Sequence, residues 1–189
     1  SQMLMHKLAE FCTVIGTGEA GIGTENVQGT LSRTYLPVEV LIGPDGQRLY
    51  FIDRNNHTIR ERGADGVVRT IAGTGELQDG TDPPIPPGAP RVAERALRHR
   101  LNHPTHMTFD AQGRMVIAAW HNSMVKRVTN IGRTSEGDMN PSMIEDLCGN
   151  GGRAFAGFRT PPAYISRQLS GIGCLRQSSW IHHASARPA

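Results

Sequence analysis

The sequence predicts an all-β protein assembled from two tandem copies of a small antiparallel sheet, each with four strands. Internal repetition is the first observation behind this prediction, because Thr13–Gly18 recurs as Thr70–Gly75 and, in outline, as Asp146–Gly151. Composition is the second, since 22 glycines and 12 prolines among 189 residues favour many short elements joined by turns. A repeated unit of this size hides its apolar surface by stacking on a neighbour, so the repeat also predicts contact between the two sheets.

The first copy is expected over residues 13–72. The segment before it, 1–12, is expected to add a strand, with Leu8–Ile15 as the outer strand of a preceding unit. The strands of the first copy are short runs that are apolar or alternate between apolar and charged residues: Val38–Ile42, Leu49–Ile52, Thr58–Arg62 and Val67–Ala72. Turn residues separate the strands, as in Pro44-Asp45-Gly46, because glycine tolerates left-handed backbone.

The second copy is expected over residues 73–148, with strands at Met107–Phe109, Met115–Ala118, Met124–Val128 and Ile144–Cys148. A rim insert at 76–101 precedes these strands and is predicted to hold loops and one or two helical turns within Val92–Leu101. A third unit starts in the same way over 149–189, but the sequence from Phe158 onward has no acidic residue and no strand alternation. This tail is interpreted as an ending of the truncated, frame-shifted or gene-fragment kind rather than as a native repeat, and the alternative is a genuine family-specific tail.

The segment Asn56-His57-Thr58-Ile59-Arg60, the Gly-x-Gly end of each copy and the proline that leads each inner strand resemble the NHL repeat over Thr13–Gly157. The resemblance implies a partial β-propeller of NHL type, in which each four-stranded blade has its first strand nearest the central channel. The second copy departs from the pattern, with Ala119 in the place of Asp53. Because two blades cannot close a ring, the resemblance implies a longer relative with about six blades or an assembly of several copies.

Loops that lead into the inner strand and loops that join the second and third strands lie on the same face of such a fold. The candidate ligand-binding residues on that face are Arg54, His103, Trp120 and His121. Trp120 is equally compatible with packing between blades, and His57 is expected to hydrogen-bond across the blade turn rather than meet a ligand. Asp53 is expected to accept backbone N–H bonds at the same turn.

Glu39 and His106 occupy equivalent positions at the channel-side start of each inner strand and are the candidate metal ligands. An imidazole and a carboxylate that face a channel can bind a divalent ion, calcium or zinc, or act as acid and base. No other cofactor is implied, and no nucleophile, base and acid occur at an interpretable spacing.

The predicted function is a non-catalytic scaffold that binds a protein or small-molecule ligand through one face, with assembly of copies into a homo-oligomer as a way to protect the open flanks. The alternative that the resemblance implies is a metal-dependent enzyme similar to propeller lyases or lactonases, in which Glu39, His106 and His121 hold a channel-bound divalent ion. RNA binding, which the resemblance also implies, is disfavoured by the charge distribution. Four arginines and no acidic residue lie from Phe158 onward, which leaves 16 Lys and Arg against 17 Asp and Glu in the rest.

No membrane span is expected, because the sequence has no run of about 18 apolar residues. The segment Ser1–Lys7 lacks the basic and apolar regions of a signal peptide. The proteins that the sequence resembles include exported and cytoplasmic examples, so both locations stay open.

Overall fold

The computed structural model describes residues 11–77, 86, 89–90, 92–132 and 138–152. The chain divides into two compact units, 1–155 and 156–189, and the second lies wholly outside the described residues. The predictions for the third unit beyond Gly152, including the atypical tail, therefore also fall outside the described residues. No helix in the described ranges is both long enough and apolar enough to cross a membrane.

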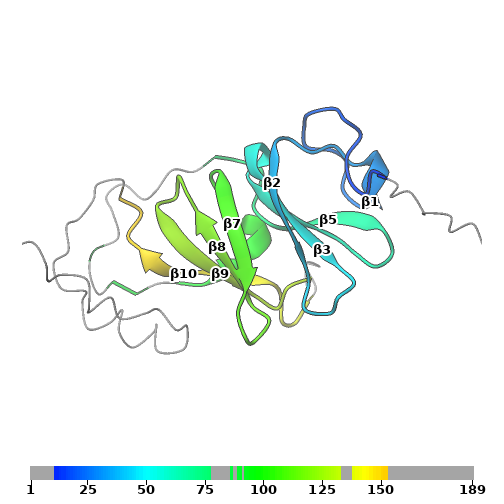
Figure 1. The fold of residues 1–189 in the computed structure, drawn as a ribbon. Coiled ribbons are helices and arrows are strands. Elements are labelled where there is room, and N and C mark those ends of the chain that lie inside the picture. Colours follow the sequence, from blue (N-terminus) through cyan, green and yellow to red (C-terminus); the bar gives the residue numbers. More distant parts are fainter. Residues whose placement is uncertain (1–10, 78–85, 87–88, 91, 133–137, 153–189) are drawn as a thin grey trace, which may run out of the picture. The chain divides into compact units, whose positions relative to one another are not determined.

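The first sheet, sheet 1, contains the four strands that the sequence predicts and one more (Figure 1). Its members are β1 (Val27–Gln28), β2 (Pro37–Ile42), β3 (Leu49–Asp53), β4 (Thr58–Arg62) and β5 (Val67–Ala72). They lie in the order β1-β5-β4-β3-β2, and every neighbouring pair is antiparallel. The two-residue strand β1 extends the sheet at its outer edge, so the expectation of four strands is corrected to five.

The second sheet, sheet 2, repeats this arrangement in the order β6-β10-β9-β8-β7. Its members are β6 (Glu94–Arg95), β7 (Pro104–Phe109), β8 (Met115–Ala119), β9 (Met124–Thr129) and β10 (Met143–Gly149). Again the four predicted strands are confirmed and the fifth, short outer strand is additional. The protein is therefore all-β, with two five-stranded antiparallel sheets.

The prediction of one or two helical turns within Val92–Leu101 is confirmed as a single 3-10 turn, η3 (Ala96–Arg98). The residues before it, Glu94 and Arg95, form strand β6, because they pair with β10 in extended conformation. The alanine and leucine content favours a longer helix, but the tertiary strand pairing outweighs this weak preference. Sheet 1 has the same arrangement, with β1 followed by η1 (Gly29–Leu31), so Glu94–Arg98 repeats an element of the first copy.

The start of the described chain takes the place of the end of a preceding sheet. The Gly16 N–H donates to the Gly29 carbonyl at 3.0 Å, and the Gly73 N–H donates to the Ala96 carbonyl at the same distance. Residues 11–15 do not form the strand expected over Leu8–Ile15, and the rest of that prediction lies outside the described residues. The repeat is thus present in the structure as well as in the sequence, because an equivalent backbone hydrogen bond forms at the start of each copy.

The glycines of the repeated motif are explained by backbone conformation and close approach. Gly73 and Gly149 have φ values of +97° and +92°, which L residues rarely adopt. A Cβ on Gly73 would lie 2.4 Å from the His57 carbonyl oxygen, and one on Gly149 would lie 2.4 Å from that of Ser123. Glycine therefore recurs at this position because the ends of β5 and β10 pass close to the backbone of the turn that precedes the neighbouring strand.

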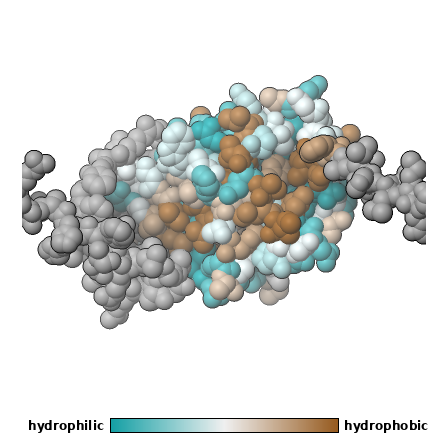
Figure 2. All heavy atoms as spheres, viewed as in Figure 1, coloured by the Kyte–Doolittle hydropathy of each residue, from teal (hydrophilic) through white to brown (hydrophobic). Residues whose placement is uncertain are grey.

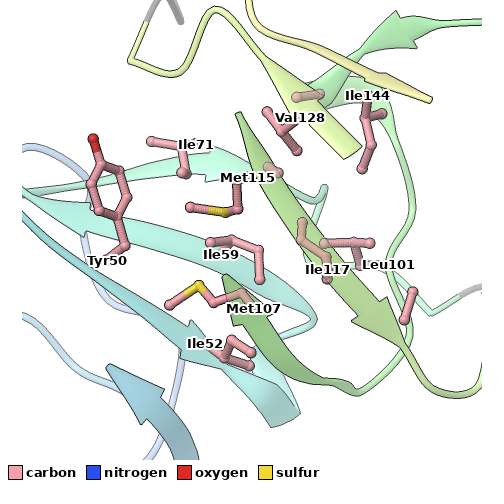
Figure 3. Close-up of a cluster of buried hydrophobic side chains, with 13 residues drawn as sticks. Tyr50, Ile52, Ile59, Ile71, Leu101, Met107, Met115, Ile117, Val128 and Ile144 are labelled. Carbon is pink, nitrogen blue, oxygen red and sulfur yellow. The ribbon is translucent and has the colours of Figure 1, made fainter. Parts of the chain in front are cut away.

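The hydrophobic core lies between the two sheets (Figure 3). Sheet 1 contributes Tyr50, Ile52, Ile59 and Ile71, and sheet 2 contributes Met107, Met115, Ile117, Val128 and Ile144. The rings of Tyr50 and Phe109 meet edge to face, with centroids 5.2 Å apart. One face of each sheet is thus buried by the other sheet, as the repeat predicts.

Candidate functional site

Three segments bring polar and aromatic side chains to the same end of the two sheets. Arg54 opens the 3-10 turn η2 (Arg54–Asn56) between β3 and β4, and Trp120 and His121 lie in the equivalent turn between β8 and β9. His103 immediately precedes the inner strand β7, and its φ of 46° turns the chain into that strand. The structure therefore brings Arg54, His103, Trp120 and His121 together, while their role in binding stays a prediction.

The rings of these segments touch one another in a chain, which we call the cationic–aromatic cluster and which consists of Arg54, His57, His103, Trp120 and His121. The ring centroids of His57 and His103 are 4.5 Å apart, and those of His103 and His121 are 4.8 Å apart. The Trp120 and His121 rings follow at 4.2 Å. The Arg54 guanidinium carbon lies 5.2 Å from the Trp120 ring centroid, within the range of a cation–π contact. The chain of contacts thus starts and ends with residues of the first copy, His57 and Arg54, and its three middle members belong to the second copy.

The cluster has a buried end and an exposed end. His57 is 8% exposed, whereas Trp120 is 55% exposed. The backbone N–H of His103 donates to His57 Nδ1 at 3.2 Å, which places the ring proton of neutral His57 on Nε2. The exposed end of the cluster therefore presents the Trp120 indole and the Arg54 guanidinium to solvent. The buried end is held in place by the hydrogen bond between the His103 backbone and the His57 ring.

The environment of His57 lowers its pKa below the ordinary value. Burial is the largest cause, and the charges of His103, Arg54 and His121 act in the same direction. Near neutral pH the buried imidazole is uncharged and can accept the His103 N–H. The unfolded chain binds a proton at this position at a higher pH than the folded chain does, so this histidine links folding to pH.

We expect the free energy of unfolding to decrease as the pH falls from 7 to 5, and to decrease less in the variant His57→Asn. A group whose folded pKa is lowered favours folding above its unfolded pKa and opposes it as pH falls below that value. Asparagine tolerates the φ of 55° at this position. Urea unfolding at several pH values measures the slope of the free energy of unfolding against pH for both proteins. Some slope remains in the variant, because burial also lowers the pKa of His99. Parallel curves for the two proteins would contradict the assignment to His57.

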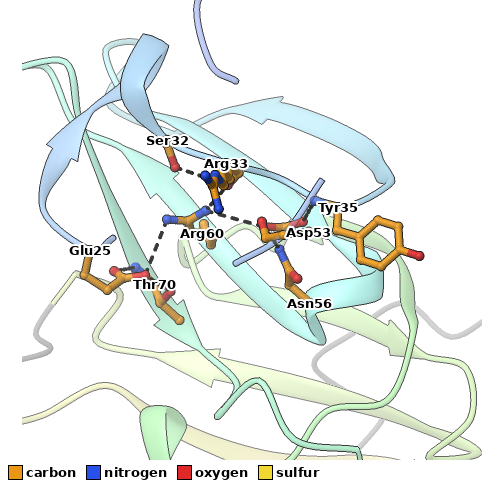
Figure 4. Close-up of polar contacts among 9 residues, drawn as sticks. Glu25, Ser32, Arg33, Tyr35, Asp53, Asn56, Arg60 and Thr70 are labelled. Carbon is orange, nitrogen blue, oxygen red and sulfur yellow. Dashed lines mark hydrogen bonds and ion pairs between the residues drawn. The ribbon is translucent and has the colours of Figure 1, made fainter. Parts of the chain in front are cut away.

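The turn that carries Arg54 is anchored by a buried ion pair (Figure 4). Asp53 accepts hydrogen bonds from the Tyr35 backbone N–H at 2.7 Å and from Asn56 Nδ2 at 2.8 Å. Its carboxylate also lies 3.4 Å from Arg60 Nη1, and both side chains are fully buried. The prediction that Asp53 accepts backbone N–H bonds is confirmed, although the donor belongs to the segment before β2 rather than to its own turn.

Burial raises the pKa of Asp53, while hydrogen bonds from Asn56 and Tyr35 and the charge of Arg60 oppose the rise. In sheet 2 the equivalent residue is Ala119, and Lys126 stands in the place of Arg60. Lys126 pairs with Asp146 at 2.5 Å instead. Each sheet therefore buries a cation of its third predicted strand, but the partner carboxylate lies on the second predicted strand in sheet 1 and on the fourth in sheet 2.

The proposed metal ligands Glu39 and His106 lie on neighbouring inner strands. The Glu39 carboxylate accepts a hydrogen bond from the Met107 backbone N–H, and the His106 side chain is exposed. Within the described ranges, no three His, Cys, Asp or Glu side chains are grouped so that they could hold a metal ion. The assignment of Glu39 and His106 to a metal stays a prediction.

Sequence reasoning identified Arg54, His103, Trp120 and His121 and missed the part that His57 plays in joining them. The expected bond across its own turn is present, because the His57 backbone N–H donates to the Arg54 carbonyl at 3.1 Å, and the His57 ring also accepts the His103 N–H at the strand entry of the next sheet. The sequence did contain a signal for this contact, because His57 follows the turn that contains Arg54, and His103 immediately precedes the next inner strand. Trp120 contacts Arg54 of the other sheet and remains exposed, and its role in stacking on a ligand stays a prediction.

Fold and site together define an all-β repeat protein of two stacked sheets with a cationic and aromatic surface at one end.

No protein-family model matches the chain, and no curated protein matches it. Among solved structures, an auxiliary nutrient binding protein from Bacteroides ovatus ATCC 8483 is similar at 22% identity and a TM-score of 0.42, over 59% of this chain and 26% of that one. An auxiliary nutrient binding protein from Bacteroides thetaiotaomicron VPI-5482 is similar at 22% identity and a TM-score of 0.40, over 70% of this chain and 27% of that one. The chain spans about a quarter of the length of these two structures.

Proposed function

We propose that this chain is a binding module, composed of neighbouring blades of an NHL-type propeller, that holds a protein or small-molecule ligand on the cationic–aromatic cluster. The observation that carries the proposal is the position of Trp120, which is 55% exposed while the Arg54 guanidinium lies over its ring. Tryptophan and arginine side chains are enriched at recognition surfaces, where an indole offers apolar area and a guanidinium offers directed donors. Loops held on a rigid scaffold are also where binding residues concentrate.

The chemistry of the cluster favours a ligand with a carboxylate and a flat face. The Arg54 guanidinium presents planar donors that match a carboxylate, and the Trp120 indole offers a surface for stacking. None of the five residues is acidic, so the cluster itself carries no charge that would repel an anion. Such a group can belong to a free carboxylic acid or to an acidic side chain of a protein.

Binding of a simple aromatic carboxylate tests this function. We expect benzoate to shift the imidazole and indole NMR signals of the cluster, and we expect glucose at the same concentration to leave them unchanged. Arg54→Ala is expected to weaken benzoate binding about tenfold, because a charge-assisted hydrogen bond is lost. Trp120→Ala is expected to have a comparable effect through the loss of stacking.

The matched control is Arg114→Ala, which removes an arginine in the β7–β8 hairpin that pairs with Asp110. Benzoate binding should be retained in that variant. Shifts that fall elsewhere in the protein, or binding that survives both cluster substitutions, would contradict the proposal. A divalent ion that copurifies stoichiometrically and is lost on Glu39→Gln or His106→Asn would instead favour the metal-dependent lyase or lactonase-like alternative.

A further inference from the structure

A cavity of about 620 Å³ lies between the two sheets, at the end of their strands opposite to the cationic–aromatic cluster. It is bounded by the β2–β3 hairpin, by the β7–β8 hairpin and by the residues that follow β9. Figure 2 shows hydrophilic side chains along the lower edge of the molecule, where Figure 1 places these turns. The inner wall of the cavity is aromatic, because Tyr50 and Phe109 meet there edge to face. The cavity therefore combines a polar rim with an apolar wall.

Glu61 on β4 places a buried carboxylate beside this cavity. It pairs in register with Tyr50 on β3, so both side chains point from sheet 1 toward sheet 2. Its Oε2 atom lies 3.8 Å from the position that a Cβ on Gly132 would take. Ile131, the neighbour of Gly132, lines the cavity together with Tyr50. Glu61 thus lies between the aromatic wall and the segment that follows β9.

The Glu61 carboxylate lacks the partner that its environment calls for. Glu61 is only 6% exposed, and its Oε2 atom is buried without a hydrogen bond to any described residue. Arg69 faces it on β5, but the Arg69 guanidinium turns to Asp65 at 2.6 Å. In sheet 2 the equivalent cross-strand pair does form, with Arg127 Nε 2.8 Å from Glu145 Oε1. Sheet 1 therefore leaves unmade an ion pair that sheet 2 makes.

The charges around the cavity leave one negative charge uncompensated. Arg48 pairs with Asp45 at 3.3 Å, and Arg114 pairs with Asp110 at 2.6 Å, so these two pairs cancel. Glu61 is the third carboxylate, and three carboxylates against two guanidinium groups give a net charge of −1. A buried carboxylate is unfavourable unless a cation and hydrogen-bond donors replace its lost hydration. The charge balance therefore favours a cationic ligand.

The two properties of the site select a particular kind of cation. An ammonium group with N–H donors satisfies a carboxylate oxygen, whereas a quaternary ammonium carries the charge but has nothing to donate. Aromatic side chains such as Tyr50 and Phe109 accommodate both a cation and the alkyl chain attached to it. An anion would meet the uncompensated charge of Glu61 and be repelled.

We propose that this cavity binds a primary alkylammonium group, which donates to the Glu61 carboxylate while its alkyl chain lies along Tyr50 and Phe109. The group belongs to a free amine or to a lysine side chain, which share this chemistry. The site is separate from the cationic–aromatic cluster and takes a ligand of the opposite charge.

Binding of butylammonium tests the site. We expect it to shift the ring NMR signals of Tyr50 and Phe109 and the amide signal of Gly132, and we expect uncharged butanol at the same concentration to shift them far less. Tetramethylammonium is expected to bind at least about tenfold more weakly than butylammonium, because it cannot donate to the carboxylate. Absence of shifts with butylammonium, or equal shifts with butanol, would overturn the proposal. Equal binding of tetramethylammonium would overturn the hydrogen bond to Glu61.

Glu61→Gln keeps the size of the side chain and removes its charge. We expect the affinity for butylammonium to fall at least about tenfold. Without the amine the variant should be no less stable in urea than the wild-type protein, because a buried unpaired charge is removed. The matched control is Glu145→Gln, which removes a carboxylate that already has Arg127 as its cation and should retain the affinity. Unchanged affinity in Glu61→Gln would contradict the role of Glu61.

Lysine with an acetylated α-amine and a methylamide at its carboxyl group distinguishes the two sources of the ammonium group. Tighter binding of this derivative than of butylammonium supports a lysine side chain of a protein as the ligand, and the reverse order supports a free amine. Failure of both compounds would remove the site. Benzoate in the same sample reports on the cationic–aromatic cluster separately, so failure at one site is distinguishable from failure at the other.

Discussion

Replacement of Arg60 by methionine is expected to destabilise the protein by about 3–5 kcal/mol, because it leaves a buried carboxylate without its cation. Arg60 and Asp53 are both fully buried, and Arg60 Nη1 also donates to the Arg33 carbonyl at 2.9 Å. Methionine keeps most of the buried volume, so the loss reports charge rather than packing. Chemical denaturation at pH 7 measures the difference in the free energy of unfolding from the wild-type protein.

The pH dependence of the Arg60→Met variant distinguishes an uncompensated charge from a packing defect. Burial already raises the pKa of Asp53 in the folded protein, and removal of the arginine raises it further. A carboxyl whose folded pKa is raised favours folding at low pH, so the deficit should shrink as the pH falls toward 4. Asp53→Ala in the same chain should recover part of the loss, since it removes the unpaired charge. Glu19→Ala, which breaks an exposed pair with Arg33, is the control and should leave stability within experimental error.

Gly73→Ala is expected to destabilise the protein by about 3–5 kcal/mol, since it combines a disfavoured backbone conformation with a collision. The new Cβ would lie 2.4 Å from the His57 carbonyl oxygen and 3.0 Å from the Thr58 Cα, and both are backbone atoms of the adjacent strand entry. Because His57 starts the cationic–aromatic cluster, the shift should also disturb the His103 contact. Thermal unfolding and the imidazole NMR signals measure the two effects.

Gly18→Ala separates the conformational cost from the collision. Gly18 has a φ of +88°, but its Cβ would meet no atom within 4 Å. Only the backbone penalty of about 1 kcal/mol is expected there. Equal losses for Gly18→Ala and Gly73→Ala would show that close approach is not the reason for the repeated glycine.

The sequence was sufficient to predict the four main strands of each sheet and the stacking of the sheets. Runs such as Leu49–Asp53 and Met115–Ala119 are apolar and bounded by turn residues, which is a strong local signal. The outer strands β1 and β6 could not be found this way, because two residues show no periodicity and form only by pairing with β5 and β10. Of the one or two helical turns expected before β7, only the 3-10 turn η3 forms, since tertiary pairing holds Glu94 and Arg95 in extended conformation.

The site was partly predictable because the repeat places equivalent loops at one end. Alignment of the two copies was enough to bring Arg54 and Trp120 to the same region. The contact of His57 with His103 depends on how one sheet stacks on the next, which periodicity does not reveal. The engagement of Glu39 with the Met107 backbone depends on the same stacking.

The two copies differ in the carboxylates that pair with their buried cations, Arg60 and Lys126. Glu25, which lies outside the sheet, accepts from Thr70 and lies 3.4 Å from Arg60 Nη2, whereas Lys126 relies on Asp146 of its own sheet. The two carboxylates beside Arg60 thus come from sheet 1 itself, as Asp53, and from the segment that leads into it, as Glu25. That lead-in segment is therefore tied by charge to the interior of sheet 1, so its removal would leave Arg60 with Asp53 alone.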